Sequence, residues 1–348
     1  MLVKVVDLFC GAGGLTHGLQ LAGLEVVAGI DLESSCRFAY ESNNSSVFIE
    51  KDITLVTKEE VNKLFSGADV RVLAGCAPCQ PFSKYTQGKD KENDKKWPLL
   101  YEFERLIRET NPEIVTMENV PDVTKHTVYE DFYKTLRLLG YHVWAEKIEC
   151  VDYDIPQNRI RHVLLASKFG ALKLSKSKSS VRLTVKECIS GLPAIQAGET
   201  DPNDPLHKAS KLSEINYKRI IHSKPGGTWK DWPPELIAPC HAKESGQGYA
   251  SVYGRMAWDK PSPTITTLCY GFGNGRFGHP EQDRAISLRE AALLQTFPIS
   301  YLFAKPGELI KMKNVGRMIG NAVPVNLGKA IGLSIVQHLQ ELQLATLK

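Results

Sequence analysis

Short apolar runs alternate with amphipathic segments along the first third of this 348-residue chain. The runs have the length of buried strands, and they fall at residues 3–9, 26–30, 47–49, 69–74 and 113–117. The segments between them repeat apolar residues at helical spacing, at 15–22, 34–40, 58–65 and 99–107. Strands that alternate with helices in this way are typical of a parallel sheet covered by helices. We therefore predict an α/β fold with a doubly wound, mostly parallel sheet.

The pattern changes after the fifth strand. A helix at 129–139, which Gly140 can cap, precedes two strands at 141–149 and 162–166 that we expect to pair. Residues 172–180 are rich in Lys and Ser and have the composition of a flexible boundary. From there to about residue 280 the chain is rich in Pro and Gly and poorly periodic, with one predicted strand at 264–268.

Two helices are predicted near the end of the chain. Ser287 and Glu290 form a capping box that begins a helix reaching residue 296. A long amphipathic helix follows Pro324 and should pack back on the first domain. We predict two domains: residues 1–171 together with 312–348, and a smaller, irregular, β-rich domain at 172–311.

Composition excludes several classes of protein. The chain is 43% hydrophobic and 24% charged, which is ordinary for a soluble globular protein. Its eight cysteines are scattered and do not complete a zinc site, so a reducing compartment fits best. No apolar run approaches about 18 residues, and the N-terminus is too short and too soon charged for a signal peptide.

Positive charge is concentrated in one region. The net charge is +4, but residues 171–280 hold 15 Lys and Arg against 9 Asp and Glu, a net +6. A basic region on a near-neutral body suggests contact with a polyanion. An ordinary solvated surface would explain the same excess.

A glycine turn follows the first strand. Gly11, Gly13 and Gly14 lie in it, and Asp31 ends the second strand 20 residues after Gly11. Glycines let a ligand approach the backbone, and a carboxylate can take both ribose hydroxyls, so the turn suits a nucleoside cofactor. The spacing is not the G-x-G-x-x-G of dinucleotide enzymes, and the negative charge of Asp7 favours S-adenosylmethionine over NAD. A turn that serves only packing is the alternative.

A second carboxylate follows the third strand. Asp52 could accept a hydrogen bond from an adenine amino group while Ile53 packs on the ring. Asp52 could equally be a plain turn or cap residue.

The segment Gly75–Ser83, GCAPCQPFS, leaves the fourth strand as a loop stiffened by two prolines. A thiol held there at Cys79 is well placed to act as a nucleophile. A packed cysteine, or a redox pair of Cys76 with Cys79, are the alternatives that this segment leaves open.

Glu118 ends the fifth strand at the same sheet edge as Cys79, so the two could supply a nucleophile and a proton donor. Gln157, Arg159 and Arg161 point one way if the backbone there is extended. The guanidinium groups of Arg159 and Arg161 could orient Glu118, a base carbonyl or a phosphate. Salt bridges on an edge strand are the alternative.

These segments, in this order, resemble the DNA cytosine-5 methyltransferases of bacterial restriction-modification or orphan type. The similarity covers nearly the whole chain, with motifs at Asp7–Gly14, Pro78–Gln80, Glu118–Val120, Gln157–Arg161, Arg284–Phe297 and Gly320–Pro324. The variable segment lies between the fourth and fifth of these, where the family keeps its target-recognition region. Two positions depart from the pattern: Leu32, where some members have an aromatic residue, and Lys51, where glycine is common.

The resemblance implies a Rossmann-like, S-adenosyl-L-methionine-dependent catalytic domain with 172–311 as target-recognition domain. The implied cofactor contacts are Phe9, Gly11, Ala12, Gly13, Gly14, Asp31, Leu32, Asp52, Ile53, Pro78, Leu99, Asn321 and Val323. The implied DNA contacts are Gln80, Ser83, Lys84, Gln157, Lys224, Arg255 and Arg276. We expect a cytoplasmic, nucleoid-associated monomer that binds double-stranded DNA and no membrane, with a cognate restriction endonuclease acting separately.

The resemblance also implies a mechanism. The Cys79 thiolate adds to carbon 6 of a flipped-out cytosine, and Glu118 hydrogen-bonds ring nitrogen 3 and the amino group. Arg161 contacts the base carbonyl and fixes Glu118, and Arg159 supports the loop. Cys76 is then a neighbouring packed residue.

Four rival functions remain in view. One is a non-enzymatic DNA-binding relative, although no catalytic motif is broken here. A tRNA cytosine-5 methyltransferase shares the same catalytic fold. A thiol-disulfide oxidoreductase would lose its function on Cys76→Ala, for which the methyltransferase hypothesis predicts a mild effect. A nicotinamide dehydrogenase would explain only the first 31 residues.

Overall fold

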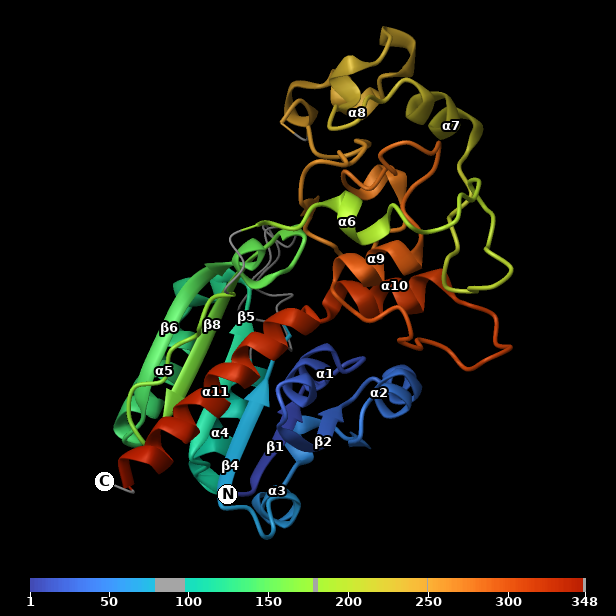
Figure 1. Cartoon of the computed structure of the whole chain (residues 1–348). Helices are drawn as coiled ribbons and strands as arrows, with labels where there is room; N and C mark the ends of the chain where they lie inside the picture. The colour runs from blue at the N-terminus through green and yellow to red at the C-terminus, as the bar shows by residue number, and fades with distance from the viewer. Residues whose placement is uncertain (79–97, 178–180, 249, 347–348) are drawn as a thin grey trace. The chain divides into compact units, whose positions relative to one another are not determined.

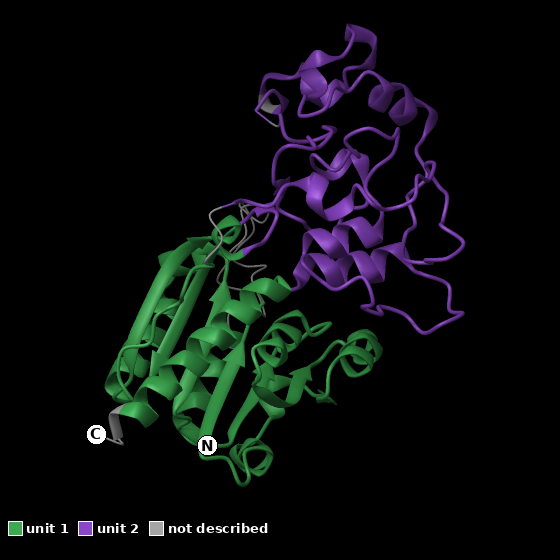
Figure 2. Ribbon diagram, in the orientation of Figure 1, with its two compact units in different colours: residues 1–153, 160–178, 323–348 green, residues 154–159, 179–322 purple. Residues whose placement is uncertain are grey.

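The chain divides into two compact units (Figures 1 and 2). The computed structural model describes residues 1–78, 98–177, 181–248 and 250–346. The first unit, green in Figure 2, comprises residues 1–153, 160–178 and 323–348, and the second comprises residues 154–159 and 179–322. The chain therefore crosses between the units four times, because the short segment 154–159 belongs to the second unit.

A seven-stranded sheet forms the centre of the first unit, in the order β3-β2-β1-β4-β5-β8-β6. Its strands are β1 (Val3–Leu8), β2 (Glu25–Asp31), β3 (Val47–Glu50), β4 (Val70–Gly75), β5 (Ile114–Asn119), β6 (His142–Glu149) and β8 (Ile160–Ser167). The first five are parallel, whereas β8 pairs antiparallel with both β5 and β6. The predicted mostly parallel α/β sheet and the predicted pairing of the last two strands are confirmed.

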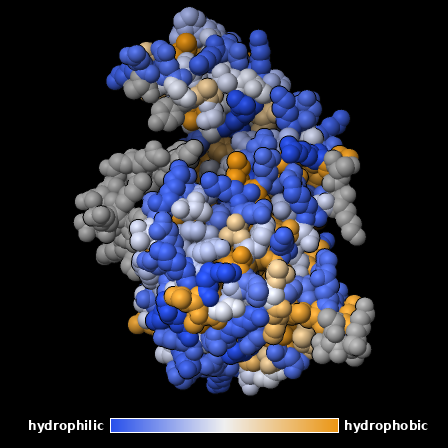
Figure 3. Space-filling model, turned by 90° about the vertical axis from the view of Figure 1, so that its left-hand side faces the viewer, coloured by the Kyte–Doolittle hydropathy of each residue, from blue (hydrophilic) through white to orange (hydrophobic). Residues whose placement is uncertain are grey.

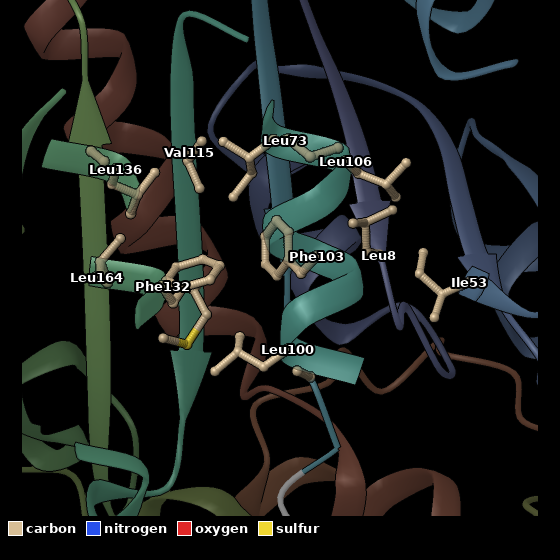
Figure 4. Packing of buried hydrophobic residues seen from close by; sticks show 14 of the residues in the cluster. Leu8, Ile53, Leu73, Leu100, Phe103, Leu106, Val115, Phe132, Leu136 and Leu164 are labelled. Atoms are coloured by element: carbon tan, nitrogen blue, oxygen red, sulfur yellow. The ribbon is translucent and has the colours of Figure 1, made fainter. Parts of the chain in front are cut away.

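Helices cover both faces of this sheet (Figure 1). They are α1 (Gly14–Leu21), α2 (Arg37–Asn43), α3 (Lys58–Leu64), α4 (Pro98–Thr110), α5 (Thr127–Leu138) and α11 (Val325–Thr346). On one face Phe103 of α4 and Phe132 of α5 pack against Leu73 and Val115 of the central strands, all fully buried (Figure 4). Removing this apolar surface from water is the main driving force for the layered fold.

The long C-terminal helix α11 packs against α1 on the other face. A Cβ atom placed on Gly18 would lie only 2.3 Å from the carbonyl oxygen of Val325, so glycine permits the close approach of the two helices. His338 of α11 also hydrogen-bonds Ser167 at the end of β8. The predicted return of the tail to the first domain is confirmed.

The span Met312–Leu344 is long and apolar enough, by length and composition only, to cross a membrane. Of its 18-residue apolar window 61% is buried, and a core helix of a globular unit passes the same test. Leu327, Ile331 and Ile335 of α11 are fully buried, as core positions are. Exposed apolar side chains elsewhere are interspersed with hydrophilic ones, as one face of the molecule shows (Figure 3).

The second unit is irregular. Its helices are short: α6 (Val185–Ile189), α7 (Glu214–Ile221), α8 (Pro239–Ala242), α9 (Leu288–Leu294) and α10 (Met312–Asn321). In the described part of this unit the strands are β7 (Gln157–Asn158) and β9 (Ser262–Pro263), with isolated bridges besides. The predicted irregularity is confirmed, but the strand content is lower than predicted because Pro and Gly interrupt backbone ladders.

The strand predicted at 264–268 is wrong. Pairing stops at Pro263, and the amide of Ile265 donates to the side chain of Gln157 rather than to the backbone of a neighbouring strand. The predicted helix that begins at a Ser287–Glu290 capping box is confirmed as α9.

Candidate active site

Left-handed backbone shapes the turn after β1. Gly11 and Gly13 have φ of +51° and +89°, values that glycine adopts without strain. Phe9 also has a positive φ, 59°, which is unusual for a bulky residue and is found at constrained functional positions. A Cβ atom on Gly11 would meet nothing within 4 Å, so the turn borders open space. Ala12, between Gly11 and Gly13, is buried, and Gly14 is the first residue of α1.

Asp31, at the end of β2, faces this turn. Its carboxylate accepts hydrogen bonds from the amides of Gly11 (2.8 Å) and Glu33 (2.9 Å). Burial raises the pKa of Asp31, and these amide donors oppose that rise. A carboxylate has about four acceptor sites, so two amide bonds leave capacity for hydroxyl donors. Leu32 beside it is 65% exposed and offers an apolar contact at the same edge.

A second carboxyl group lies beneath the turn. Asp7 is 1% exposed, and Thr16 donates a hydrogen bond to its Oδ2 at 2.7 Å. Its Oδ1 is buried and has no hydrogen-bond partner among the described residues. Burial raises the pKa of Asp7 to about 7. A buried, incompletely satisfied carboxyl group fits a cationic ligand nearby, because such a charge would offset its desolvation.

The other predicted cofactor residues differ in exposure. Asp52 caps the short turn Ile53–Leu55, since its Oδ1 accepts from the amide (3.0 Å) and hydroxyl (2.9 Å) of Thr54. Ile53 is 5% exposed. Pro78 and Leu99 are half-buried, and Leu99 packs against the core beneath the sheet edge.

Asn321 and Val323 fall on different units. Asn321 is the exposed last residue of α10, in the second unit. Val323, 4% exposed, belongs to the first unit just before α11. The division between the two units therefore passes through the motif that the sequence predicts to close over the cofactor.

Glu118 and Arg161 form a buried ion pair at the end of the sheet. Arg161 Nε lies 2.8 Å from Glu118 Oε1, with the two side chains 12% and 3% exposed. The guanidinium is not aligned for a hydrogen bond, so Oε1 has an ionic partner but no hydrogen-bond donor among the described residues. The other carboxyl oxygen, Oε2, accepts from the thiol of Cys76 at 2.8 Å.

Asn119 ties the start of the predicted catalytic loop to β5. Its Nδ2 donates to the carbonyl oxygen of Ala77 at 3.2 Å, and its Oδ1 accepts from the amide of Val120 at 2.8 Å. Asn119 is fully buried, so both bonds are shielded from water. The residues that lead into the loop are thereby fixed beside Glu118. The predicted nucleophile Cys79, and with it Gln80, Ser83 and Lys84, lies outside the described residues.

The arginine motif does not act as one row of side chains. Arg161 bonds within the first unit, whereas Arg159 is buried in the second and donates to the carbonyl oxygens of Ile265 (3.0 Å) and Ala322 (3.4 Å). Gln157 is fully buried and bonds to Leu294 and Gln295. The prediction that Gln157 contacts DNA does not agree with this burial. The amide of Arg159 bonds back to the carbonyl oxygen of Gln157 (2.8 Å), so the backbone is not continuously extended there and the assumed alternation does not hold.

Among the predicted DNA contacts of the second unit, Lys224 is exposed and Arg276 is half-buried. Arg255 is 4% exposed and donates to the carbonyl oxygens of Ile220, Ser223, His279 and Gln282 and to Asp283. The prediction that Arg255 contacts DNA is therefore corrected: its five donors hold separate loops of the second unit together.

Cys76 is predicted from the sequence as a packed neighbour of the site, but its bond to Glu118 is not. It is half-buried and bonded to Glu118, rather than simply packed. The pairing of β4 with β5 could have predicted this contact, because parallel neighbouring strands that end at one edge of a sheet place the residues at their ends side by side.

Comparison with known proteins matches the chain to one family. The family model of C-5 cytosine-specific DNA methylases aligns with residues 3–337. The Type II methylase M.HgiDII of Herpetosiphon aurantiacus is 55% identical, over 98% of this chain and 97% of its own. The Type II methyltransferase M.Eco47II of Escherichia coli is 31% identical, over 97% of this chain and 80% of its own.

Solved structures share the fold. A putative DNA modification methyltransferase encoded within a prophage of E. coli superposes with a TM-score of 0.75 at 21% identity, covering 97% of this chain and 99% of its own. The Entamoeba histolytica methyltransferase EhMeth superposes with a TM-score of 0.63 at 15% identity, covering 97% and 99%.

Proposed function

The chain belongs to the C-5 cytosine-specific DNA methylases and is a DNA cytosine-5 methyltransferase, and from this premise we propose that it methylates a cytosine flipped out of duplex DNA through a covalent Cys79 adduct. The observation that supports this most directly is the buried Glu118–Arg161 pair, which joins the end of β5 to the start of the antiparallel strand β8, next to β4, after which Cys79 follows in the sequence. A short specific DNA sequence is the target we propose, with residues 172–311 as target-recognition domain.

We propose S-adenosylmethionine as the methyl donor. When bound, it supplies an electrophilic methyl group on a positively charged sulfur. Asp31 would accept from the ribose hydroxyls, Leu32 would contact the adenine ring, and the turn at Gly11 gives the open space that a ligand needs. Phe9, Ala12, Gly13, Gly14, Asp52, Ile53, Pro78, Leu99, Asn321 and Val323 complete the proposed set.

Cys79 would make carbon 5 of the ring reactive. Carbon 5 of cytosine is a poor nucleophile, but addition of a thiolate at carbon 6 moves electron density onto it. Methylation at carbon 5, removal of the carbon-5 proton and breaking of the sulfur–carbon 6 bond then restore the ring. A free thiol has a pKa near ~8.5, so the site must favour the thiolate or couple its deprotonation to attack.

Glu118 and Arg161 would stabilise the charge that this addition creates. Glu118 hydrogen-bonds ring nitrogen 3 and the amino group, and Arg161 contacts the base carbonyl while holding the carboxyl group through their ion pair. Charge-assisted contacts in a buried site are stronger than in water. Arg159, which braces two carbonyl oxygens of the second unit, would support the site without touching the base.

The DNA substrate must open for this chemistry. The target carbon lies inside the base stack, so the base is flipped out at a cost of a few kcal/mol. Contacts from Gln80, Ser83, Lys84, Lys224 and Arg276 are proposed to offset this cost. The Type II methylases among its relatives support a restriction-modification role, for which we propose a separate cognate endonuclease.

Methylation sequencing tests the proposed function. DNA from an unmethylated host that expresses the wild-type chain should carry 5-methylcytosine at one short sequence, and DNA from a Cys79→Ser host should carry none. Purified Cys79→Ser protein should still bind duplex DNA. Transfer to tRNA in preference to duplex DNA, or 5-methylcytosine made by Cys79→Ser at the wild-type level, would contradict the proposal.

A further inference from the structure

We propose that Cys76 is a positioning residue for the methyl-transfer reaction: its thiol holds one oxygen of Glu118, so that the other oxygen remains available to the cytosine ring. This inference rests on the proposed function of Glu118. It assigns to Cys76 a role that is separate from nucleophilic attack, and it predicts that loss of the thiol slows catalysis without weakening substrate binding.

Strand register brings Cys76 and Glu118 together. The parallel strands β4 and β5 pair Gly75 with Met117, so the next residue on each strand, Cys76 and Glu118, also lie side by side. Met117 points into the core under α4 and α5, and side chains alternate, so Glu118 and Cys76 share the opposite face. The thiol-to-carboxylate distance of 2.8 Å follows from this placement.

The third member of the group comes from the next strand. Glu118 pairs with Val163 of β8, and Arg161, two residues earlier, lies on the same face. Adjacent strands β4, β5 and β8 thus present a thiol, a carboxyl group and a guanidinium in a row. The sheet fixes Glu118 and Arg161, and Cys76 follows β4 directly, with its amide bonded to the carbonyl oxygen of Leu8 in β1 (3.3 Å).

The two carboxyl oxygens of Glu118 have different surroundings. Oε2 accepts the Cys76 thiol, whereas Oε1 is buried next to Arg161 and has no hydrogen-bond donor among the described residues. The charge of Arg161 offsets the burial of Oε1, and the remaining acceptor capacity of this oxygen can take a donor from a ligand. We therefore assign Oε2 to Cys76 and Oε1 to the base, where its two lone pairs would serve the adjacent ring nitrogen 3 and amino group.

A thiol suits this position because it tolerates a change of protonation. The S–H group is a weak donor to a carboxylate, and the sulfur atom is a weak acceptor from a carboxylic acid. Arg161 can only donate, so it pairs best with the ionised form. Cys76 can keep its contact with Oε2 while Glu118 shares a proton with the ring, and so holds the carboxyl group in one orientation through the reaction.

Steady-state and single-turnover kinetics test this assignment. Methyl transfer from labelled S-adenosylmethionine to duplex DNA is measured for the full-length wild type, Cys76→Ala, Cys76→Val and Cys76→Ser, across pH 6 to 9. Cys188→Ala, in α6 of the second unit, is the control for loss of a half-buried cysteine. Melting temperatures show whether each variant is folded.

The inference predicts a split between kcat and KM. Cys76→Ala and Cys76→Val should lower kcat about tenfold, the effect of one lost hydrogen bond to a charged group, with both KM values within about twofold and an altered pH profile. Cys76→Ser keeps a donor and acceptor and should stay within about threefold of wild type, as should Cys188→Ala. In a Glu118→Gln background, Cys76→Ala should add little further loss, since the two residues act as a unit.

Three results would overturn the inference while leaving the proposed function standing. These are an unchanged kcat and pH profile in both Cys76→Ala and Cys76→Val, a loss in Cys76→Ser equal to that in Cys76→Ala, and full additivity with Glu118→Gln. If only one of Cys76→Ala and Cys76→Val folds, the kinetics of the folded variant decide. Absence of methyl transfer by the wild type would instead remove the proposed function on which the inference depends.

Discussion

The carboxyl group of Glu118 is the best-defined chemical group of the site. It is 3% exposed and paired with Arg161 at 2.8 Å. Glu118→Gln removes the charge and the exchangeable proton but keeps the shape, so methyl transfer should fall by about 10²–10⁴-fold, the usual contribution of a general acid. Radiolabel transfer and a DNA-binding assay measure the two effects, with Glu130→Gln on the exposed surface of α5 as control. A wild-type rate in Glu118→Gln would contradict the assigned role.

Asp7 should make the stability of the unliganded chain depend on pH. Burial raises its pKa from 3.8 to about 7, so the folded state binds a proton more tightly than the unfolded state does. Stability from this group is full below pH 4 and is lost as pH rises toward 7, by about 2–4 kcal/mol in total. Asp7→Asn lacks this dependence.

The comparison of unfolding at pH 5 and pH 8 tests the Asp7 prediction. Asp7→Asn should be more stable, relative to wild type, at pH 8 than at pH 5. Asp259→Asn, at an exposed position of the second unit, is the control and should show the same difference at both values. A wild type that loses no more stability than Asp7→Asn between these pH values would show that Asp7 stays ionised in the fold.

At the scale of elements, helix α9 depends on one buried ion pair. Glu290 receives two 2.7 Å bonds from Arg284, and both side chains are at most 1% exposed. Burial alone would raise the pKa of Glu290, but the bonds and charge of Arg284 outweigh it and lower the pKa. Glu290→Gln leaves Arg284 buried without its counter-charge and should cost the second unit about 3–5 kcal/mol.

Thermal or denaturant unfolding measures this loss, with Glu214→Gln as control. Glu214 forms an ion pair of the same length with Lys218, but its side chain is 84% exposed, so its replacement should leave the melting temperature unchanged. Equal effects of the two substitutions would mean that burial does not distinguish these ion pairs.

The elements also show what sequence patterns can and cannot predict. Strands β1, β2, β4 and β5 follow from their apolar runs because they are largely buried, and the short edge strand β3 still keeps a local apolar run although Val47 is exposed. The roles of Gln157 and Arg255 do not follow, because their hydrogen-bond partners lie more than 20 residues away in sequence. Polar residue types are also expected at the surface, so their burial is not predicted from the sequence. The bond of Cys76 to Glu118 does not follow for a related reason: it depends on pairing between strands, which residue types alone do not reveal.

At the scale of the whole molecule, the distribution of charge separates a basic region from the rest of the chain. Residues 171–280 carry a net +6, whereas the whole chain carries +4, so the remainder is slightly negative. Some of these cations are committed inside the second unit, as Arg219 and Arg255 are, each at most 9% exposed. Exposed lysines such as Lys224 and Lys230 remain for phosphates. The electrostatic contribution to DNA binding should therefore be smaller than the formal charge suggests.

Salt titration of DNA binding measures that contribution. Each phosphate neutralised releases counterions and adds about −0.9 to the slope of log affinity against log salt, so even three or four contacts should weaken binding clearly between about 50 and about 200 mM salt. Lys224→Gln should lower the magnitude of this slope by about one unit and weaken binding to all sequences alike. Lys58→Gln, the same change at an exposed position of α3, should leave the slope unchanged. An affinity that stays flat across this salt range would rule out phosphate contacts by the basic region, and a loss confined to one DNA sequence would make Lys224 a base-reading residue instead.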